Sequence, residues 1–427
     1  MIVLNKQKNR YAKYKPTGIE WIGEIPVDWG KWKIAHLFKV NRGRVIDKTQ
    51  ISIEQNNEQP YPVFSSQTQN NGCLGYIETY DYDKDSITWT TDGANAGSVF
   101  YRQGKFNATN VCGILTLMEK NQDYEYLTYC IRVAGLNNRR VDILGYKIMS
   151  NEMASIKIPL PSLTEQQTIS AYLDEKTLLI DNIISLKHKQ IDLLQERRTT
   201  LINQVVTKGL DKNVEMVDSG IERIGTIPKD WEVRKLKYET IINIDSLGEK
   251  ENPNMELLYV DIGNVNILGI QNEPELLYFS EAPSRARRKV KDGDTILGTV
   301  RTYLKAIAYI NNPLPNLIVS TGFAVIQPQN KMDNKYLYYQ LLSEAFIQKV
   351  VANSKGVSYP AINSTELGVL KILIPSIEEQ KAIADYLDSS TSQIDKTIKA
   401  VGKSIDLLTE YKQSLISNVV TGKVKVF

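Results

Sequence analysis

Hydrophobic residues recur at alternating intervals of four and three near the middle of the chain and again near its end. This spacing is typical of a helix that packs along one face against another helix in a coiled coil. The other faces of each stretch are polar, so each predicted helix needs a partner, and the nearest candidate is the other stretch. The predicted contact positions are Leu173, Thr177, Ile180, Ile184, Lys187, Ile191, Leu194, Arg198, Leu201 and Val205, and, 214 positions later, Leu387, Thr391, Ile394, Ile398, Val401, Ile405, Leu408, Lys412, Leu415 and Val419.

Both predicted helices have recognisable starts. Ser162 and Ser376 follow a proline, and each precedes a glutamate by three residues, Glu165 and Glu379. This is the spacing of a capping box, in which the two side chains satisfy free backbone N–H groups at the helix start. Each helix should run for roughly 40 residues, about 60 Å. The predicted ends are marked by Lys208-Gly209 and Gly422-Lys423.

The contact face of each helix contains one long cation at the same position of the repeat, Arg198 and Lys412. A polar residue in such a face can fix the register of two helices, and its aliphatic stem can still pack. We therefore expect these two residues to help align the helices.

The segments that precede the helices are repeated as well. Residues 17–29 (TGIEWIGEIPVDW) return 202 positions later as residues 219–231 (SGIERIGTIPKDW). Residues 158–167 (IPLPSLTEQQ) return 214 positions later as residues 372–381 (ILIPSIEEQK). The stretches between these motifs barely align. A shared frame around two unlike inserts suggests one scaffold that presents two different recognition surfaces.

The inserts have the pattern of mixed α/β domains. Short runs of β-branched and aromatic residues lie between Gly, Asn and Asp turns, and one short helical pattern follows in each insert. The inserts should therefore share a fold and differ in surface. The predicted strands include residues 86–90, 113–117, 295–299 and 322–326, and the predicted helices residues 124–131 and 335–342.

The predicted fold class is α+β, with two mixed α/β globular domains separated by two long helices that form an antiparallel coiled coil in a pseudo-two-fold internal repeat. The predicted divisions are a basic N-terminal segment (1–16), a first globular domain (17–155), a first helical spacer (156–210), a second globular domain (211–370) and a second helical spacer (371–427). If a two-fold relates the repeats, the chain near Val424 should lie close to Pro16.

Composition narrows the class of protein only slightly. The 427 residues carry a net charge of +3, so any surface that binds anions must arise from local clustering. The three cysteines, Cys73, Cys112 and Cys130, form no C-x-x-C pair, which favours reduced thiols. No secretory leader and no apolar run long enough to cross a bilayer is evident, so we expect a cytoplasmic protein with no membrane partner.

Sequence motifs for catalysis are weak. There are two histidines, and His188 lies in a predicted long helix without ligand spacing around it. No phosphate-binding glycine loop is found, and residues 93–97 (GANAG) have the wrong spacing for one. The Asn/Asp-Pro-Pro-aromatic loop of a base-modifying methyltransferase is also missing. Asp230, Glu232 and Lys235 match a nuclease site loosely, but the set belongs to the repeated Ile-Pro-x-Asp-Trp frame, and we interpret it as structural.

Basic and amide-rich loops remain as candidates for recognition. Arg pairs with guanine edges and phosphates, and Asn and Gln pair with adenine edges. Each run taken alone is better explained as a solvated loop, but all of them lie in the divergent inserts and none in the shared frame. Trp29 and Trp231 belong to the frame and are interpreted as core residues. The candidate DNA-binding residues are Arg42, Arg44, Ser66, Gln67, Asn70, Asn71, Thr91, Asn95, Arg139, Arg140, Arg285, Arg287, Arg288, Lys289, Arg301, Tyr303, Lys305 and Tyr359.

These repeated motifs resemble those of the specificity (S) subunit of type I restriction–modification systems. The resemblance rests on the entry motif at residues 18–29 and 220–231, and on the exit motif at residues 161–166 and 375–380. Each exit motif leads into a long helix, and the resemblance covers nearly the whole chain.

The resemblance implies that the inserts are target recognition domains and that the long helices form an antiparallel coiled coil. It also implies two methyltransferase (M) subunits, which use S-adenosylmethionine to methylate adenine, and restriction (R) subunits for ATP-dependent translocation and cleavage. S-adenosylmethionine, ATP and Mg²⁺ would then bind to partner subunits, with no cofactor and no catalytic residue in this chain. Recognition loops vary within the family, so no base-reading residue can be transferred.

The hypothesis is a reader of double-stranded DNA whose two domains each recognise one half of an asymmetric target. The half-sites would lie in successive major grooves, with the coiled coil setting the spacer and docking the methyltransferase subunits. A coiled-coil scaffold that binds proteins and not DNA is the alternative, and a methyltransferase or nuclease ranks third. Scaffold function alone would leave the Arg- and Asn/Gln-rich loops unexplained.

Overall fold

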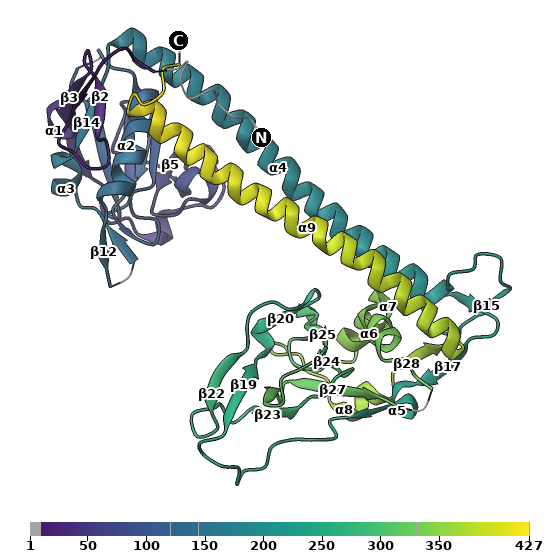
Figure 1. Ribbon diagram of the computed structural model, residues 1–427. Helices are drawn as coiled ribbons and strands as arrows, with labels where there is room; N and C mark the ends of the chain where they lie inside the picture. The colour runs from purple at the N-terminus through teal and green to yellow at the C-terminus, as the bar shows by residue number, and fades with distance from the viewer. Residues whose placement is uncertain (1–9, 120, 144, 330, 427) are drawn as a thin grey trace. The chain divides into compact units, whose positions relative to one another are not determined.

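The computed structural model describes residues 10–119, 121–143, 145–329 and 331–426 (Figure 1). The chain divides into two compact units, Met1–Lys187 with Lys403–Phe427, and His188–Gly402. The long helices are α4 (Leu163–Lys208), with 46 residues, and α9 (Ile377–Val420), with 44, both slightly longer than predicted. Each unit therefore contains one globular domain, the beginning of one long helix and the end of the other.

The globular part of unit 1 is built on an antiparallel sheet in the order β4-β11-β7-β9. Strand β7 (Ser86–Thr90) is central and fully buried, because helix α2 (Tyr124–Asn138) packs on this sheet. The remaining strands and α-helices are β1 (Tyr14–Pro16), β2 (Glu24–Pro26), β3 (Gly30–Lys33), α1 (Ile34–Leu37), β4 (Phe38–Arg42), β5 (Tyr61–Phe64), β6 (Cys73–Ile77), β8 (Asp92–Gly93), β9 (Val99–Arg102), β10 (Asn107–Ala108), β11 (Cys112–Leu117), β12 (Arg140–Asp142), β13 (Gly145–Lys147), α3 (Ser150–Ser155) and β14 (Lys157–Leu160).

Unit 2 repeats this framework. Its sheet β18-β27-β24-β25 has the same antiparallel order, with β24 (Thr295–Gly298) in the place of β7 and α6 (Asn334–Leu342) in the place of α2. A second four-stranded sheet, β22-β19-β26-β23, stands where unit 1 has the three-stranded sheet β10-β5-β6. The other strands and α-helices are β15 (Met216–Asp218), β16 (Thr226–Pro228), β17 (Glu232–Lys235), α5 (Leu236–Glu239), β18 (Thr240–Ile242), β19 (Glu256–Val260), β20 (Val265–Asn266), β21 (Gly269–Ile270), β22 (Glu275–Tyr278), β23 (Ala286–Lys289), β25 (Ile307–Tyr309), β26 (Leu317–Ser320), β27 (Phe323–Pro328), α7 (Glu344–Ala352), α8 (Ser364–Gly368) and β28 (Lys371–Ile374).

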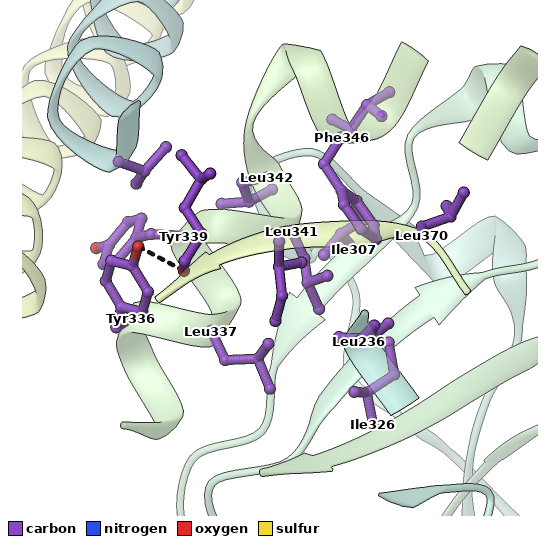
Figure 2. Close-up of a cluster of buried hydrophobic side chains, with 14 of the residues drawn as sticks. Leu236, Ile307, Ile326, Tyr336, Leu337, Tyr339, Leu341, Leu342, Phe346 and Leu370 are labelled. Carbon is purple, nitrogen blue, oxygen red and sulfur yellow. Dashed lines mark hydrogen bonds between the residues drawn. The ribbon is translucent and has the colours of Figure 1, made fainter. Parts of the chain in front are cut away.

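The core of unit 2 joins its domain to the long helices. Figure 2 shows Leu337, Leu341 and Phe346 converging with Leu236 and Ile326 between helix and sheet. The same cluster takes in Ile202 and Val206 near the end of α4 and Ile383 and Leu387 near the start of α9. Unit 1 has the corresponding cluster, which includes the frame tryptophan Trp29, 1% exposed. Trp231 is 5% exposed, so both tryptophans are core residues as predicted.

The exit-motif glutamine ties each domain to its long helix by the same set of bonds. The buried Gln166 accepts a hydrogen bond from Asp123 N at 3.0 Å and donates to Pro161 O at 2.9 Å. Gln380 accepts from Asp333 N at 2.9 Å and donates to Pro375 O at 3.0 Å. Each Gln side chain thereby satisfies one backbone N–H and one backbone C=O that burial would otherwise leave without a hydrogen bond.

The helix caps confirm half of the predicted capping box. Ser162 Oγ accepts from Glu165 N at 3.4 Å, and Ser376 Oγ accepts from Glu379 N at 3.2 Å. The second predicted bond, from the backbone N–H of the capping serine to the glutamate side chain, is replaced by a bond to a more distant residue. Glu165 accepts from Tyr11 Oη at 2.7 Å, and Glu379 accepts from Trp231 Nε1 at 3.0 Å.

The predicted contact face of the long helices is confirmed, since none of its positions is exposed. In unit 1, Ile169 and Leu173 of α4 share a cluster with Leu415 and Val419 of α9, so the helices run antiparallel there. The two cations in this face pair with aspartates of the opposite helix. Arg198 lies 3.0 Å from Asp395 in unit 2, and Lys412 lies 2.6 Å from Asp181 in unit 1.

The chain near its C-terminal end lies against residues 11–14, close to the place predicted. Tyr14 Oη donates to Gly422 O at 3.0 Å, and Val424 packs on the cluster that includes Tyr11. Strand β1, which contains Tyr14, pairs with β2 as β15 pairs with β16 in unit 2. The fold class predicted from the sequence is thus confirmed, including the internal repeat.

Candidate nucleic-acid interface

Three loops of unit 1 that carry candidate residues meet in the structure. Asn95 Nδ2 donates to Ser66 O at 3.4 Å, and Arg139 Nη1 donates to Ala96 O at 3.2 Å. Gly93 pairs with Tyr146 in the ladder between β8 and β13, which brings the β12–β13 hairpin to the same place. Gln67, Asn70, Asn71 and Arg140 belong to these loops.

The remaining candidates of unit 1 border this group. Arg42 Nε donates to Asn110 O at 2.6 Å, and Arg44 forms an isolated bridge with Thr109. Thr109 in turn bonds Ser65 Oγ at 3.1 Å, so the end of β4 adjoins the loop that carries Ser66. Candidate DNA-binding residues that are far apart in the sequence therefore lie in one region of the domain.

The loop at residues 68–72 has an unusual backbone. Asn70 and Asn71 both adopt left-handed conformations, with φ of 48° and 51°, which Asn tolerates better than most residues. Their side chains are exposed. Arg102 supports the loop from inside, where its Nη1 donates to Asn71 O at 2.7 Å. The amide groups are thus presented outward on a fixed backbone.

Arg102 was not identified as a functional candidate from the sequence. It is 3% exposed, and its guanidinium lies 3.5 Å from the ring centroid of Phe64 and 4.6 Å from that of Phe100. Burial lowers the pKa of Arg102 to about 10, so the group stays charged at neutral pH. Its sequence context, the end of a strand next to Gln103-Gly104, gave no signal of burial.

Thr91 is the one candidate whose side chain the structure places inside the domain. It is 0% exposed, and its Oγ1 donates to Val111 O at 3.1 Å. A buried hydroxyl that is already bonded cannot contact a base at the surface, so Thr91 was wrongly included. Its carbonyl accepts from Ile148 N at 2.8 Å, which makes Thr91 an anchor for the loop before α3.

In unit 2 the candidates form two groups on either side of one turn. Arg285, Arg287, Arg288 and Lys289 lie on or next to the edge strand β23. Arg301, Tyr303 and Lys305 lie in the turn that follows β24, and Tyr359 stands beside them. The turn at residues 321–322 joins the groups, because Thr321 N donates to Arg285 O at 2.7 Å and Thr299 N donates to Gly322 O at 2.8 Å.

The turn at residues 301–305 is bounded by two left-handed residues, Arg301 with φ of 51° and Lys305 with φ of 53°. Between them Tyr303 and Leu304 are 53% and 47% exposed. Two non-glycine residues in this conformation cost free energy that surrounding contacts must offset. Arg301 N donates to Pro360 O at 2.8 Å, one of the contacts that hold the turn.

Most of the candidate cations fall into two classes. Of the ten cations, five are paired with carboxylates, which reduces their charge toward a ligand. Three others stack on aromatic rings, with no carboxylate partner among the residues that the structure describes. Arg42, bonded to Asn110 O, and Arg288 belong to neither class. The paired groups are Arg44–Asp81, Arg140–Glu152, Arg285–Asp261, Lys289–Asp245 and Lys305–Glu344. The stacked groups are Arg139 on Tyr146, Arg287 on Phe279 and Arg301 on Tyr359.

Arg288 behaves differently from its neighbours. Its Nη1 donates to Ser246 Oγ at 3.1 Å, while its Nε is buried without a hydrogen-bond partner in the described structure. Burial also lowers the pKa of Arg288. This side chain is therefore partly committed to the fold of the β23 edge, and it is a weaker candidate for contact with bases than Arg287.

The described residues also answer two narrower questions, on metal clusters and on membrane-spanning helices. Over residues 10–119, 121–143, 145–329 and 331–426, no cluster of His, Cys, Asp or Glu has the geometry to hold a metal ion. Within the same ranges, no helix has the length and apolarity needed to span a membrane. The three cysteines are buried and unpaired, and burial raises the pKa of the Cys112 thiol to about 11.

A comparison with known protein families agrees with the resemblance seen in the repeated sequence motifs. The type I restriction modification DNA specificity domain matches twice, over residues 26–196 and 228–401. Together these ranges cover well over half of the sequence, and each contains one globular domain and part of a long helix. The chain belongs to the type I restriction–modification specificity family.

Individual relatives agree with this assignment. The type I restriction enzyme MjaVIII specificity subunit of Methanocaldococcus jannaschii is 27% identical over 428 residues and covers 94% of each chain. The N-terminal part of a type I specificity subunit of Mycoplasma pneumoniae is 41% identical over 143 residues, 34% of this chain and 75% of that one. A solved structure concerned with complex assembly and conformational transition of a type I R-M system has a TM-score of 0.66 at 14% identity, covering 93% of this chain and 98% of that one, which shows the shared fold.

Proposed function

We propose that this chain is the DNA sequence-specificity subunit of a type I restriction–modification complex. Each globular domain would read one half of an asymmetric, bipartite target in double-stranded DNA. The long helices would set the spacer between the half-sites and dock two methyltransferase subunits, with restriction subunits added in the full complex.

The observation that carries this proposal is the contrast between frame and loops. Bonds of the frame repeat almost atom for atom: Tyr129 Oη donates to Asp174 at 2.7 Å, and Tyr339 Oη donates to Asp388 at 2.7 Å. The exposed loops that carry the Arg and amide side chains differ in sequence and in backbone. A support that is repeated within the chain and carries two different polar surfaces suits a molecule that reads two different sequences.

The same proposal assigns the chemistry to other subunits. S-adenosylmethionine would be bound by the methyltransferase, and ATP and Mg²⁺ by the restriction subunits. The chain would be non-catalytic: purified alone, it should show no methylation, cleavage or ATP hydrolysis. Robust activity that survives removal of every partner would contradict this assignment.

The decisive experiment uses the chain co-purified with its methyltransferase. Adenine methylation is mapped in a host that expresses both subunits, and duplexes with and without the mapped sequence are then compared by filter binding. We expect one bipartite motif and tighter binding to the duplex that contains it. A complex that assembles normally but binds all duplexes equally would instead establish the alternative, a protein-binding scaffold without DNA readout.

A further inference from the structure

In each unit, the most exposed β-branched apolar side chain of the described residues lies on a loop tip. Ile143, which follows β12, is 98% exposed, and Val357, in the loop after α7, is 101% exposed. A single exposed apolar residue is ordinary on a protein surface. The two tips need an explanation because they occupy the same place in domains whose inserts otherwise differ.

The place is defined by equivalent backbone bonds. Ile148 N donates to Thr91 O at 2.8 Å, and Ile362 N donates to Thr299 O at 2.9 Å. Thr91 and Thr299 each follow the strand at the same position of the repeated sheet, β7 or β24. Both tips therefore precede the same anchor point, just before α3 and α8.

Each loop also contains a glycine with positive φ, two residues after Ile143 in one and directly before Val357 in the other. Gly145 has φ of 124° and Gly356 has φ of 114°, a region that residues with a side chain rarely adopt. Each loop then presents a tyrosine under an arginine: Arg139 lies 3.9 Å from the Tyr146 ring centroid, and Arg301 lies 4.5 Å from that of Tyr359.

The two stacked arginines come from different elements. Arg139 caps the end of α2, whereas Arg301 belongs to the turn after β24. The arrangement is therefore not simply inherited with the repeated frame, since each domain builds it from different residues. Because both domains stack an arginine on a tyrosine beside the tip, but take the arginine from different elements, we infer that this stacking serves the same purpose in both.

Charge around the tips suits a polyanion. Glu152 of α3 pairs with Arg140 at 2.8 Å, and Glu366 of α8 pairs with Lys355. Because Glu152 and Glu366 are already paired, they do not oppose the positive charge of the stacked arginine. A guanidinium held over a ring is pre-oriented and keeps N–H groups free for phosphate or base edges.

An apolar tip needs an apolar target. Among the groups that the base pairs present in the major groove, the thymine 5-methyl is the apolar one. Resting on the proposed function, we propose that Ile143 and Val357 each contact a thymine methyl group, one in each half of the DNA target, with Arg139 and Arg301 fixing the approach of the tip.

The test uses the complex with its methyltransferase and duplexes of the mapped target in which each thymine is replaced in turn by deoxyuridine. This replacement removes the methyl group and keeps base pairing. For the wild type we expect one position in each half-site where affinity falls about fourfold, as for one buried methyl group. Ile143→Ser should lower affinity for the normal target equally and abolish the deoxyuridine effect in one half-site only, and Val357→Ser in the other.

Matched controls are available in the same two units. Ile53, 89% exposed, and Leu314, 62% exposed, lie on other loops, and Ile53→Ser and Leu314→Ser should leave both affinity and the deoxyuridine effects unchanged. Because all four side chains are exposed, thermal unfolding should be the same for every variant.

Two results would overturn the proposal. If the target is bound specifically but no thymine methyl matters, or if the serine variants keep the full deoxyuridine effect, the tips do not read methyl groups while the proposed function stands. If the complex shows no sequence preference at all, the proposed function fails together with this inference.

Discussion

Gln166 illustrates how one side chain can fix a domain to a helix. Its amide satisfies Asp123 N and Pro161 O in the interior of unit 1. We expect Gln166→Ala to lower the free energy of unfolding by about 2–4 kcal/mol, because each buried group left unpaired costs about 1–3 kcal/mol. Urea unfolding followed by circular dichroism measures this. Gln167→Ala, at an exposed neighbouring position, is the control and should change stability little.

Arg287 is the candidate on the β23 edge that combines a stacked guanidinium with no carboxylate partner in the described structure. Arg287→Ala should weaken target binding by about 1–3 kcal/mol and relax one target position if it reads a base. If it contacts a phosphate, all sequences should weaken alike and the salt dependence should become shallower. Lys229→Ala, an exposed cation paired with Glu215 in the frame, is the control. Unchanged affinity and salt slope for Arg287→Ala would show that this edge is only a solvated surface.

At the scale of elements, the two ion pairs between the long helices should differ in value although they occupy equivalent positions. The Arg198 side chain is 7% exposed, whereas that of Lys412 is 25% exposed. Asp395→Asn strips Arg198 of its acidic partner and should cost about 1–2 kcal/mol, discounted because Asp395 itself is partly exposed. Asp181→Asn should cost under about 1 kcal/mol. Equal losses in thermal unfolding would mean that burial does not set the value of these pairs.

A second line of side chains, each one residue before a contact position, differs between the units. In unit 1 it includes Leu179 and Ile183, 49% and 43% exposed, and the repeat places Gln393 and Thr397 at these positions in unit 2. If a helix of the methyltransferase docks along this line, the first copy should bind unit 1. Docking on unit 1 would bury the exposed parts of Leu179 and Ile183, which should strengthen binding by about 1–2 kcal/mol.

Reciprocal variants test this order of assembly by native mass spectrometry. Leu179→Gln with Ile183→Thr should weaken binding of the first methyltransferase roughly tenfold. Gln393→Leu with Thr397→Ile should strengthen binding of the second. Indifference of both variants would show that the methyltransferase docks elsewhere.

The sequence predicted the elements well where a periodic pattern or a repeated motif was present. The contact face from Leu173 to Val205, the tryptophans and the serine caps follow from local spacing, which helix geometry converts directly into position. The partners of Glu165 and Glu379 could not be predicted, because Tyr11 and Trp231 reach them only through tertiary folding. The same limit applied to Thr91, whose burial depends on a loop 20 residues away.

At the scale of the whole molecule, the two domains should read different half-sites. The β10-β5-β6 sheet of unit 1 and the β22-β19-β26-β23 sheet of unit 2 differ in strand number, and their edge loops carry different side chains. Different polar surfaces contact different base edges. The mapped methylation motif should therefore be asymmetric, and a perfect palindrome would contradict the assignment of one domain to each half-site.

The spacer of that motif should follow helix length. The test lengthens both long helices by four residues, inserted between residues 187 and 188 of α4 and between residues 402 and 403 of α9. These sites are far in sequence from Gln166 and Gln380, whose bonds fix the domains to the helices. The added length is about 6 Å, against about 3.4 Å per base pair. Methylation mapping should show a spacer one or two base pairs longer and unchanged half-sites. An unchanged spacer would mean that the helices do not measure it.

The paired charges of the long helices have a consequence for the origin of the chain. Asp181 and Arg198 lie on one helix, and Asp395 and Lys412 occupy the corresponding positions on the other. A helix with its acid and its cation at these two positions is complementary to an inverted copy of itself. A half-length ancestor with one domain and one helix could thus have paired with its twin and recognised a symmetric sequence. Gene duplication and fusion would then have freed each half to acquire its own specificity.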